Sequence, residues 1–399
     1  MYKITKQICL SVYVNLIEKY AKMCVDNAIA IIMYILRVFP IRKNKILFSS
    51  FNSQYSDNPR FIYEALMYDS GLEFVWVTNG HLKIPGNVRQ VCHRSLQWLW
   101  ELATARVWVD NSRKVLGVRK RKGQYYIQTW HGNIGIKKVE NDAKDSLPVR
   151  YILQAENDSK MIDLFLSGSV WCTRLYRNAF WYRGKILEHS LPREDIFYSD
   201  PKSIVGRVRD FYRLSSDTQI AIYAPTFRAD CSLDVYDLDY NRLLTNLKLK
   251  FKTDWVLLIR LHPHIADKEK LIHYSDVVLN GTKYPDMNEL IVAARLLITD
   301  YSSCMFDAAT AGKGVLLYAS DKAVYEQDRG MYFSLSELPF PLAESNDQLE
   351  KNILQFNENV CIADGKAFLR RHGCYTSGGG AELVANHIRN VLKERNEKS

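Results

Sequence analysis

Several features of well-known protein classes are missing from this chain. Its 399 residues hold no C-x-x-C pair and no histidine at metal-ligand spacing, so we predict no structural metal site. The eight cysteines lie far apart, a distribution typical of buried thiols in a reducing compartment. There is no zinc-finger spacing and no aromatic RNA-binding signature, and the basic residues are dispersed, so we expect no nucleic acid partner.

Long apolar runs are missing as well. Residues 27–40 have an apolar core of about a dozen residues, whereas a bilayer-spanning helix needs about 20, so we expect no membrane span. No small-residue cleavage site follows this run, which disfavours a secretory signal. Lysines and arginines surround the apolar residues of the first 45 positions, a mixture typical of helices lying in the headgroup layer of an anionic membrane. A basic helical pair packed on the protein's own core fits the pattern equally well.

What the chain does have is a globular composition and an excess of positive charge. Hydrophobic residues make up 47% of it, and 54 lysines and arginines against 44 acidic residues give a formal net charge of +10. Such a field by itself fits a nucleic acid, an anionic membrane or a phosphorylated substrate, and the charge alone cannot choose among these partners. The length fits two domains, and two domains enclose a cleft.

The pattern after Pro40 alternates short apolar segments with helical stretches. This alternation predicts an α/β fold with parallel sheets, in which helices cross over on the sheet faces. A polar stretch with two prolines at residues 187–202 predicts the hinge between two doubly wound units. We therefore expect basic amphipathic helices over residues 1–43, one Rossmann-like domain over 44–195 and a second over 196–399. The expected strands lie at residues 46–50, 73–79, 106–111 and 124–132, and then at 219–227, 254–264, 277–281, 296–303 and 314–320.

Polar residues end the strand expected at 296–303, at the point where a helix begins. Ser302 and Ser303 can direct hydroxyl and backbone N–H groups at phosphate oxygens, with the helix dipole behind them. This arrangement predicts a diphosphate site, although an ordinary helix cap is equally compatible with the position. Asp307, one helical turn further on, either accepts a ligand hydroxyl or is a solvated helix residue. Ligands of open parallel sheets bind beyond the carboxyl ends of the strands, which favours the site.

Two further strand ends carry residues suited to the same anion. In the segment RLHPH, Arg260 can bind phosphate and His262 can protonate a leaving phosphate oxygen. In the segment YAPTFR, Thr226 and Arg228 offer a hydroxyl and a guanidinium. A single histidine is more often structural, but the conjunction of the two motifs favours a functional interpretation.

The first half of the chain has one strand end of the same kind, in the segment QTWHG. His131 and Gly132 end this strand, and Lys137 and Lys138 follow. A histidine with an ordinary pKa of about 6.5 can remove a proton from an attacking hydroxyl at neutral pH. A core histidine packed on Trp130 is the alternative. If the two halves close on each other, His131 faces the serine pair across the cleft.

Taken together, these motifs resemble the CDP-glycerol glycerophosphotransferases of teichoic acid and capsule synthesis. The similarity extends over residues 44–392 and is carried by several ordered motifs rather than by one short pattern. The motifs are QTWHG with the following lysine pair, LPREDIF, YAPTFR, RLHPH, ITDYSSCMFD, DRGMYF and ELPFPLAES.

The resemblance implies a fold like that of the GT-B glycosyltransferases, held at the cytoplasmic face of the cell membrane without spanning it. It therefore favours the membrane interpretation of residues 1–43. The donor it implies is CDP-glycerol or CDP-ribitol. A hydroxyl of a lipid-linked glycan or polymer acceptor attacks the β-phosphorus and releases CMP. No cofactor is implied, and no Asp-x-Asp pair follows a strand, so we expect diphosphate binding without a metal.

Site residues follow from the same resemblance, position by position. It implies catalytic roles for His131, as general base, and for His262 at the diphosphate. The residues implied in donor binding are Thr226, Arg228, Arg260, Ser302, Ser303 and Asp307. The residues implied in shaping the cleft or the acceptor side are Gly132, Lys137, Lys138, Arg193 and Asp300. The domain at 44–195 is then the acceptor side, and the domain at 196–399 binds the CDP-alditol.

The chain departs from the family pattern in two places. The family usually continues WHGT-P-L-KK, whereas Asn133, Ile134, Gly135 and Ile136 precede the lysines here, one residue more and without the proline. The segment HSLPRED replaces a glycine-containing PRND segment around Arg193. These changes concern acceptor geometry more than the donor motifs, which are intact.

Two other functions stay open at this stage. A GT-B sugar transferase would hold a nucleotide-diphosphate sugar in the same site, with His131 activating attack on a sugar carbon. A catalytically silent membrane adaptor would bind a polyanionic polymer through the +10 charge. The sequence also leaves open glycerol against ribitol, the identity of the acceptor, and single addition against polymerisation.

Overall fold

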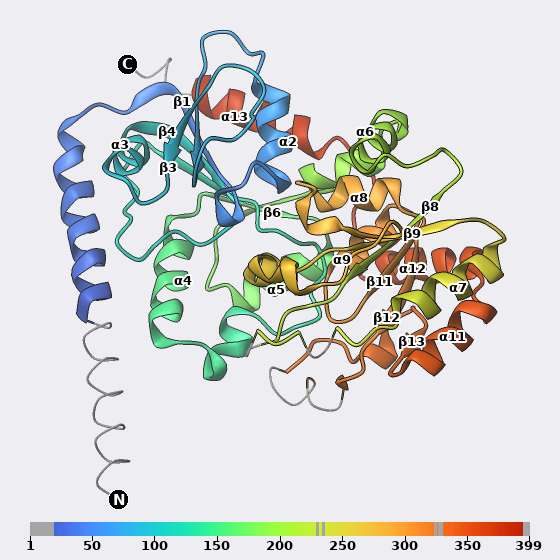
Figure 1. Ribbon diagram of the computed structural model, residues 1–399. Helices are drawn as coiled ribbons and strands as arrows, with labels where there is room; N and C mark the ends of the chain where they lie inside the picture. The colour runs from blue at the N-terminus through green and yellow to red at the C-terminus, as the bar shows by residue number, and fades with distance from the viewer. Residues whose placement is uncertain (1–19, 229–230, 234–235, 323–324, 326–329, 394–399) are drawn as a thin grey trace, which may run out of the picture.

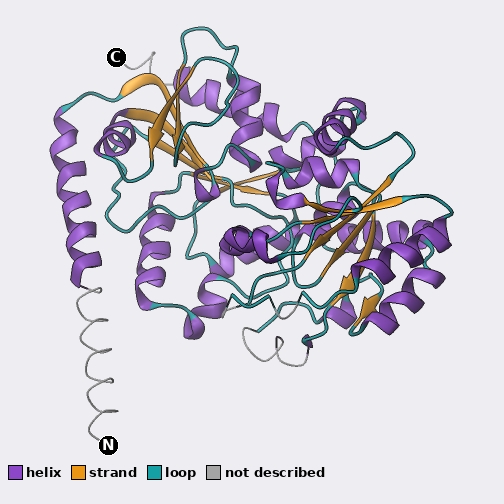
Figure 2. Ribbon diagram, viewed as in Figure 1, coloured by secondary structure: helices purple, strands orange, loops and turns teal. Residues whose placement is uncertain are grey.

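The computed structural model describes residues 20–228, 231–233, 236–322, 325 and 330–393. It contains two parallel sheets, each covered by helices (Figures 1 and 2). We call the first sheet with its helices the N-terminal lobe and the second sheet with its helices the C-terminal lobe. The α/β class with two doubly wound sheets, which the sequence predicts, is confirmed.

The first sheet has seven described strands in the order β3-β2-β1-β4-β5-β6-β7, and every neighbouring pair is parallel. The strands are β1 Arg42–Ser49, β2 Glu73–Thr78, β3 Val88–Cys92, β4 Ala105–Asp110, β5 Tyr125–Gln128, β6 Leu164–Ser167 and β7 Lys185–Glu188. The α-helices of this part of the chain are α2 Asp57–Leu66, α3 Leu96–Thr104, α4 Val149–Met161 and α5 Val170–Ala179. The sequence predicts β1, β2, β4 and β5 but not the edge strands β3 and β7, whose segments VRQVC and KILE are largely polar and partly exposed, and not the interior strand β6.

The second sheet has six described strands in the order β10-β9-β8-β11-β12-β13, again all parallel. The strands are β8 Gln219–Ala224, β9 Trp255–Ile259, β10 Val278–Asn280, β11 Leu296–Thr299, β12 Gly314–Tyr318 and β13 Leu342–Ala343. The α-helices are α6 Lys202–Tyr212, α7 Tyr240–Phe251, α8 Met287–Ala293, α9 Cys304–Thr310, α11 Asn346–Gln355, α12 Glu358–Arg371 and α13 Gly380–Lys393. All five expected strands are present, and only the two-residue β13 is missed.

Short 3-10 helices occupy several of the connections. They are η1 Leu36–Val38, η2 Phe51–Ser53, η3 Glu140–Ser146, η4 Pro192–Phe197, η5 Pro263–Leu271, η6 Gly281–Lys283 and η7 Leu335–Glu337. The helix η4 lies in the expected hinge stretch and contacts α2 and α13 on one side and α8 and α9 on the other. The hinge segment is thus packed between the lobes rather than exposed as a free linker.

Both sheets have the strand order of a Rossmann fold. In this order, successive strands are added toward one edge of the sheet in the first half and toward the other edge in the second half. The reversal falls between β1 and β4 in the first sheet and between β8 and β11 in the second. Helices leave to opposite faces at such a point, so a crevice opens beyond the carboxyl ends of the two strands. The segments after β8 and β11, which carry Thr226 and the serine pair, therefore begin at this crevice.

The position of the helix α13 is contrary to the expected domain boundary. Residues 196–399 are expected to form one unit, but α13 packs on the N-terminal lobe, beside α2 (Figure 1). Its buried side chains, Val384, Ala385, Ile388 and Val391, share a core with strands of the first sheet. The spacing of these residues predicts an amphipathic helix. It does not reveal which sheet supplies the complementary apolar surface.

A helix described over residues 20–35 lies along the outside of the N-terminal lobe. Ile29 and Met33 are buried against the lobe, and Asp26 accepts two charge-assisted hydrogen bonds of 2.8 Å from Arg150 in α4. The part of the expected 1–43 segment before residue 20 lies outside the described residues. Among the helices that the structure describes, none combines the length and the apolar character needed to cross a bilayer.

Candidate functional site

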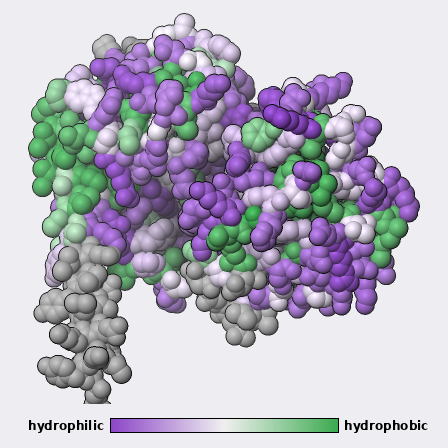
Figure 3. Space-filling view, in the orientation of Figure 1, coloured by the Kyte–Doolittle hydropathy of each residue, from purple (hydrophilic) through white to green (hydrophobic). Residues whose placement is uncertain are grey.

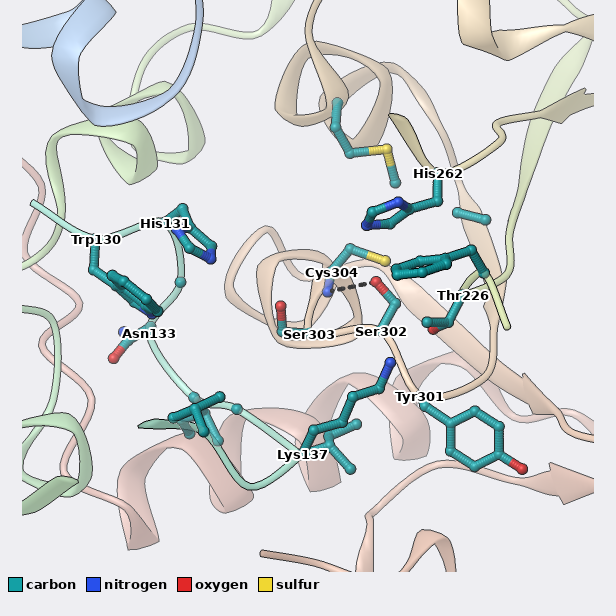
Figure 4. A pocket seen from close by; sticks show the side chains of 18 of the residues that line it. Trp130, His131, Asn133, Lys137, Thr226, His262, Tyr301, Ser302, Ser303 and Cys304 are labelled. Carbon is teal, nitrogen blue, oxygen red and sulfur yellow. Dashed lines mark hydrogen bonds between the residues drawn. The ribbon is translucent and has the colours of Figure 1, made fainter. Parts of the chain in front are cut away.

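A cavity of about 470 Å³ lies where the two crevices face each other, and both lobes line it (Figure 4). The predicted site residues that line it are His131, Gly132, Lys137, Thr226, Arg260, His262, Ser302 and Ser303. A Cβ atom built on Gly132 would lie 3.8 Å from the Ser303 hydroxyl oxygen. The histidine loop of one lobe and the serine pair of the other therefore meet across the cavity.

One ring nitrogen of His131 is hydrogen-bonded to the protein backbone. Its Nδ1 lies 2.9 Å from the backbone oxygen of Asn111, at the end of β4. A carbonyl oxygen can only accept, so Nδ1 carries the proton and Nε2 holds the basic lone pair. The ring also stacks on Trp130 at 4.3 Å between centroids, and Trp130 itself has a positive φ of 51°. Trp130 and His131 lie in the loop after β5, and this backbone turn places the imidazole at the cavity wall (Figure 4).

The surroundings of His131 favour its neutral form. The residue is exposed to the cavity, but protein groups of both lobes surround the ring, and the resulting desolvation lowers its pKa. The Arg193 guanidinium lowers the pKa further, whereas the Asn111 carbonyl and the carboxylates of Asp57 and Glu140 oppose the shift. A histidine that stays neutral at physiological pH is ready to accept a proton.

His262 has the opposite tautomer. It caps η5, and its Nδ1 accepts a hydrogen bond of 3.2 Å from the backbone N–H of His264. The proton of the neutral ring is therefore on Nε2, which makes that nitrogen a donor. Burial, together with the charges of His264, Lys137 and His131, lowers the pKa of His262 to about 4. At neutral pH this side chain is therefore a neutral hydrogen-bond donor rather than an acid.

The serine hydroxyls point into the cavity rather than capping α9. Ser303 occupies the N-cap position with helical dihedral angles and makes no side-chain capping hydrogen bond. The Ser302 hydroxyl lies 3.5 Å from the backbone N–H of Cys304, a long contact (Figure 4). The geometry thus supports the anion-site interpretation over the ordinary cap, since both hydroxyls can turn to a ligand.

Asp300 does not line the cavity; it fixes the loops that do. The carboxylate is 1% exposed and accepts hydrogen bonds from the N–H and hydroxyl of Thr226, at 2.8 and 2.7 Å. It also accepts from the backbone N–H of Tyr301 at 2.6 Å and from the Arg228 guanidinium at 2.9 Å. One buried carboxylate therefore ties the segment after β8 to the segment after β11.

Arg228 supports the site from behind and does not line the cavity. Its guanidinium pairs with Asp321 at 2.6 Å as well as with Asp300, and it lies over the rings of Tyr325 and Tyr301. Arg260 does line the cavity, and it donates to the backbone oxygens of Gly281 and Tyr284 at 2.9 and 2.6 Å. Neither arginine reaches the anion site as a mobile side chain, because protein oxygens hold both.

The two lysines after His131 differ in position. Lys137 lines the cavity, and its ammonium lies 5.0 Å from the ring centroid of Tyr325 in the C-terminal lobe. In Figure 4 the side chain reaches toward the serine pair. Lys138 is exposed and does not line the cavity, and its backbone N–H donates to Gly330 at 3.1 Å. Lys137 is thus placed to contact an anion directly.

Asp307 and Arg193 are not on the cavity wall either. The Asp307 carboxylate is 6% exposed and pairs with the Arg193 guanidinium, which contacts Asp57 at 3.4 Å as well. The expectation that Asp307 accepts a ligand hydroxyl therefore stays a prediction, and it requires this ion pair to open. What the structure shows instead is an interaction between the lobes.

Asn111 and Asp57 are the site residues that the sequence analysis misses. Asn111 holds the imidazole of His131, and its own amide nitrogen donates to Asp57 at 2.8 Å. Asn58 donates to the backbone oxygen of Trp130 at 3.1 Å. One signal was present in the sequence, because Asn111 ends the expected strand at 106–111 as the recognised site residues end theirs. Asp57 is the first residue of α2 and carried no such signal.

Comparisons with known proteins agree with this geometry. The model of the CDP-Glycerol:Poly(glycerophosphate) glycerophosphotransferase family matches residues 31–390. A teichoic acid glycerol-phosphate transferase of Staphylococcus aureus (strain NCTC 8325 / PS 47) is 30% identical, over 94% of this chain and 100% of its own. A teichoic acid poly(glycerol phosphate) polymerase of Staphylococcus epidermidis is 29% identical over 89% of this chain, which spans about half, 52%, of that longer relative.

Solved structures of the wall teichoic acid polymerase TagF have the same fold. One superposes with a TM-score of 0.81 at 26% identity and covers 95% of this chain and 99% of that chain. A TagF variant soaked with CDPG superposes with a TM-score of 0.80, also at 26% identity, over 96% of this chain and 99% of that chain. The two-sheet architecture is GT-B-like, as expected. The chain belongs to the CDP-glycerol:poly(glycerophosphate) glycerophosphotransferase family.

Proposed function

We propose that this protein transfers glycerol phosphate or ribitol phosphate from a CDP-alditol to a hydroxyl of a membrane-linked teichoic acid or capsule acceptor, with release of CMP. The observation that carries the proposal is the cavity in which the basic Nε2 of His131 faces the hydroxyls of Ser302 and Ser303. The relatives include transferases and polymerases named for glycerol phosphate and, at 24% identity, one named for ribitol phosphate.

The N-terminal lobe supplies the base. His131 Nε2 takes the proton of the acceptor hydroxyl, whose oxygen then attacks the β-phosphorus of the donor. A new oxygen–phosphorus bond forms, and the bond from the bridging oxygen to the β-phosphorus breaks. CMP leaves with the electron pair of that bond. Phosphoryl transfer of this kind needs positioning and charge stabilisation more than covalent chemistry.

The C-terminal lobe supplies most of the donor site. Its serine hydroxyls and the Nε2–H of His262 converge with the Lys137 ammonium of the N-terminal lobe on the space where the diphosphate would lie (Figure 4). Donors placed in advance around developing negative charge lower the barrier, because they need no reorganisation during the reaction. An approaching phosphate also raises the pKa of His262, so this side chain can give a proton or a hydrogen bond to the departing CMP oxygen.

The acceptor side is the apolar wall of the cavity. Trp130, Trp171 and Leu175 line it from the N-terminal lobe, opposite the polar donor side. Gly135, in the loop that departs from the family pattern, lies beside Trp171, and a Cβ built on it would be in ordinary van der Waals contact with the ring, at 3.7 Å. The longer loop and this wall would together set the shape offered to the acceptor.

The runner-up is a sugar transferase of the GT-B type, which would use the same cavity. It is less well supported, because the matched relatives are named for glycerol phosphate or ribitol phosphate transfer. The adaptor hypothesis is weaker still. It gives no reason for a neutral base and an anion site in one cavity.

We propose further that the helix over residues 20–35 lies on the cytoplasmic face of the cell membrane. Its outer side carries exposed large side chains, among them Ile31 at 60%, Tyr34 at 71% and Ile35 at 58%. Figure 3 shows a hydrophobic patch over this helix. The exposed Arg37, Arg42 and Lys43 follow the helix directly. An apolar face next to basic residues suits the interface of an anionic bilayer.

Turnover of the donor tests the main proposal. Purified protein with CDP-glycerol or CDP-ribitol should release CMP only when a lipid-linked glycan or polymer acceptor is present. Phosphorus NMR should show a new phosphodiester in the product. His131→Ala should lower kcat by about a hundredfold to ten-thousandfold, the usual contribution of a general base.

The matched control for that variant is His273→Ala, which removes an exposed histidine of the C-terminal lobe and should leave turnover unchanged. The donor that turns over names the alditol. A glycosidic product from a nucleotide sugar, with no CMP from either CDP-alditol, would contradict the proposal in favour of the runner-up.

The pH dependence of the reaction follows from the environment of His131. The base acts only when unprotonated, so activity is present above its pKa and is lost as the pH falls through it. Because burial lowers this pKa, the acid limb of the kcat/KM profile should have its midpoint below the ordinary value of about 6.5. A midpoint well above that value would show that another group is the base.

Membrane binding is tested by sedimentation with phosphatidylglycerol vesicles. The double variant Ile31→Glu with Tyr34→Glu should bind vesicles at least about tenfold more weakly, because it places two charges on the apolar face. Leu249→Glu alters a 54% exposed leucine of α7 in the C-terminal lobe and should leave binding unchanged. Equal loss in both variants, or no loss in either, would overturn the membrane role of this helix.

A further inference from the structure

Arg193 lies where η4 passes between the two lobes, and its guanidinium contacts both of them. In the N-terminal lobe it donates to the backbone oxygen of His131 at 3.0 Å and to the Asp57 carboxylate at 3.4 Å. In the C-terminal lobe it donates to the Asp307 carboxylate. The arginine side chain is 13% exposed, so little water competes for these bonds. Its own backbone N–H is held by the side-chain oxygen of Asn58 at 3.0 Å.

The partners of Arg193 are attached to the two functional groups of the cavity. Asp307 is in α9, the helix that begins directly after Ser302 and Ser303. Asp57 accepts from the amide of Asn111 at 2.8 Å, and Asn111 accepts from the imidazole Nδ1. One side chain is thus connected to the serine helix, to the backbone of the base residue and, through Asp57, to the group that orients the base.

We propose that Arg193 is a positioning residue that sets the distance and orientation of His131 relative to the serine pair. The inference rests on the proposed function, since it assigns His131 as the base and the serine pair as the donor site. It goes further because it names the interaction that keeps groups of two separate lobes in register. No contact between Arg193 and the substrate is required.

The geometry requires an arginine rather than any positive charge. Three acceptors surround the group, and a planar guanidinium presents its donors in a fixed fork. A lysine ammonium is a single point charge on a flexible stem and cannot hold the same three acceptors in one plane. Loss of the fork would allow the lobes to shift, and a misplacement of about 1 Å is enough to cost up to a hundredfold in rate.

The charge of Arg193 also lowers the pKa of His131. The charged groups facing His131 are the Arg193 guanidinium and the carboxylates of Asp57 and Glu140, and the titratable but neutral His262 lies beyond the cavity. Glu140 is already neutralised by Arg113 at 2.9 Å. Removing the Arg193 charge should therefore raise the pKa of His131, and removing the Asp57 charge should lower it.

The experiment compares Arg193→Lys, Arg193→Gln and Asp57→Asn with the wild type. Arg193→Lys should lower kcat by about tenfold to a hundredfold while the KM for the CDP-alditol changes by less than about threefold, because the donor site is untouched. Arg193→Gln should move the acid limb of the kcat/KM profile to higher pH. Asp57→Asn should move it to lower pH, the opposite direction.

Arg60→Gln is the matched control. Arg60 also connects the lobes, from α2 to Asp286 at 2.9 Å and to Glu289 at 3.0 Å, but it does not contact His131. This variant removes a buried interface charge of the same kind and should lower the melting temperature as Arg193→Gln does. It should leave the acid limb where it is in the wild type.

An NMR titration of the His131 ring gives the same comparison without turnover. A raised pKa in Arg193→Gln and a lowered one in Asp57→Asn, with the wild-type value in Arg60→Gln, would support the proposal. Unchanged kcat in Arg193→Lys, or acid limbs that move alike in the Arg193→Gln and Arg60→Gln variants, would overturn it. If the wild type turns over no CDP-alditol, the proposed function fails, and the titration still decides whether Arg193 is coupled to His131.

Discussion

The architecture depends on one constraint, that neighbouring strands run parallel throughout both described sheets. Parallel strands must be joined by crossover connections, so all of their carboxyl ends lie at one edge of the sheet. At that edge, loops and the N-termini of helices present polar groups that no strand can pair. The protein places two such edges against each other, and the cavity lies between them.

The facing edges divide the chemistry between the lobes. One edge provides an imidazole whose tautomer is set by the Asn111 carbonyl, and the other provides hydroxyls at the start of α9. A transfer reaction needs the two groups in register, although they belong to different sheets. Three arginines with buried carboxylate partners lie around this arrangement: Arg60 and Arg193 between the lobes, and Arg228 within the C-terminal lobe. Buried ion pairs add little net stability, because desolvation offsets the attraction. We attribute their presence to the geometry they fix.

The parts of the site that the sequence could predict are those carried by short, continuous segments. Strand ends are local features, and the serine pair, RLHPH, YAPTFR and QTWHG each carry their signal within a few residues. The first sheet was predicted less completely than the second. Its edge strands β3 and β7 have the segments VRQVC and KILE, in which polar residues interrupt the apolar ones and at most one residue is buried.

Contacts between distant segments could not be predicted in this way. The amphipathic pattern of α13 was visible, but its position on the N-terminal lobe depends on the surface of α2. Asp307 was expected at the ligand, and the structure pairs it with Arg193, 114 positions away in the chain. Asp57 and Arg228 likewise take their roles from partners that only the fold brings near.

The central claim is that donor binding belongs to the C-terminal lobe and proton removal to the N-terminal lobe. The most direct measurement is the binding of CDP-glycerol, or of CDP-ribitol if that is the donor, by isothermal titration calorimetry to two variants. His131→Ala should bind the donor with a Kd close to that of the wild type, whereas Ser302→Ala combined with Ser303→Ala should bind at least about tenfold more weakly. Loss of donor binding in His131→Ala, with wild-type affinity in the serine variant, would contradict the account.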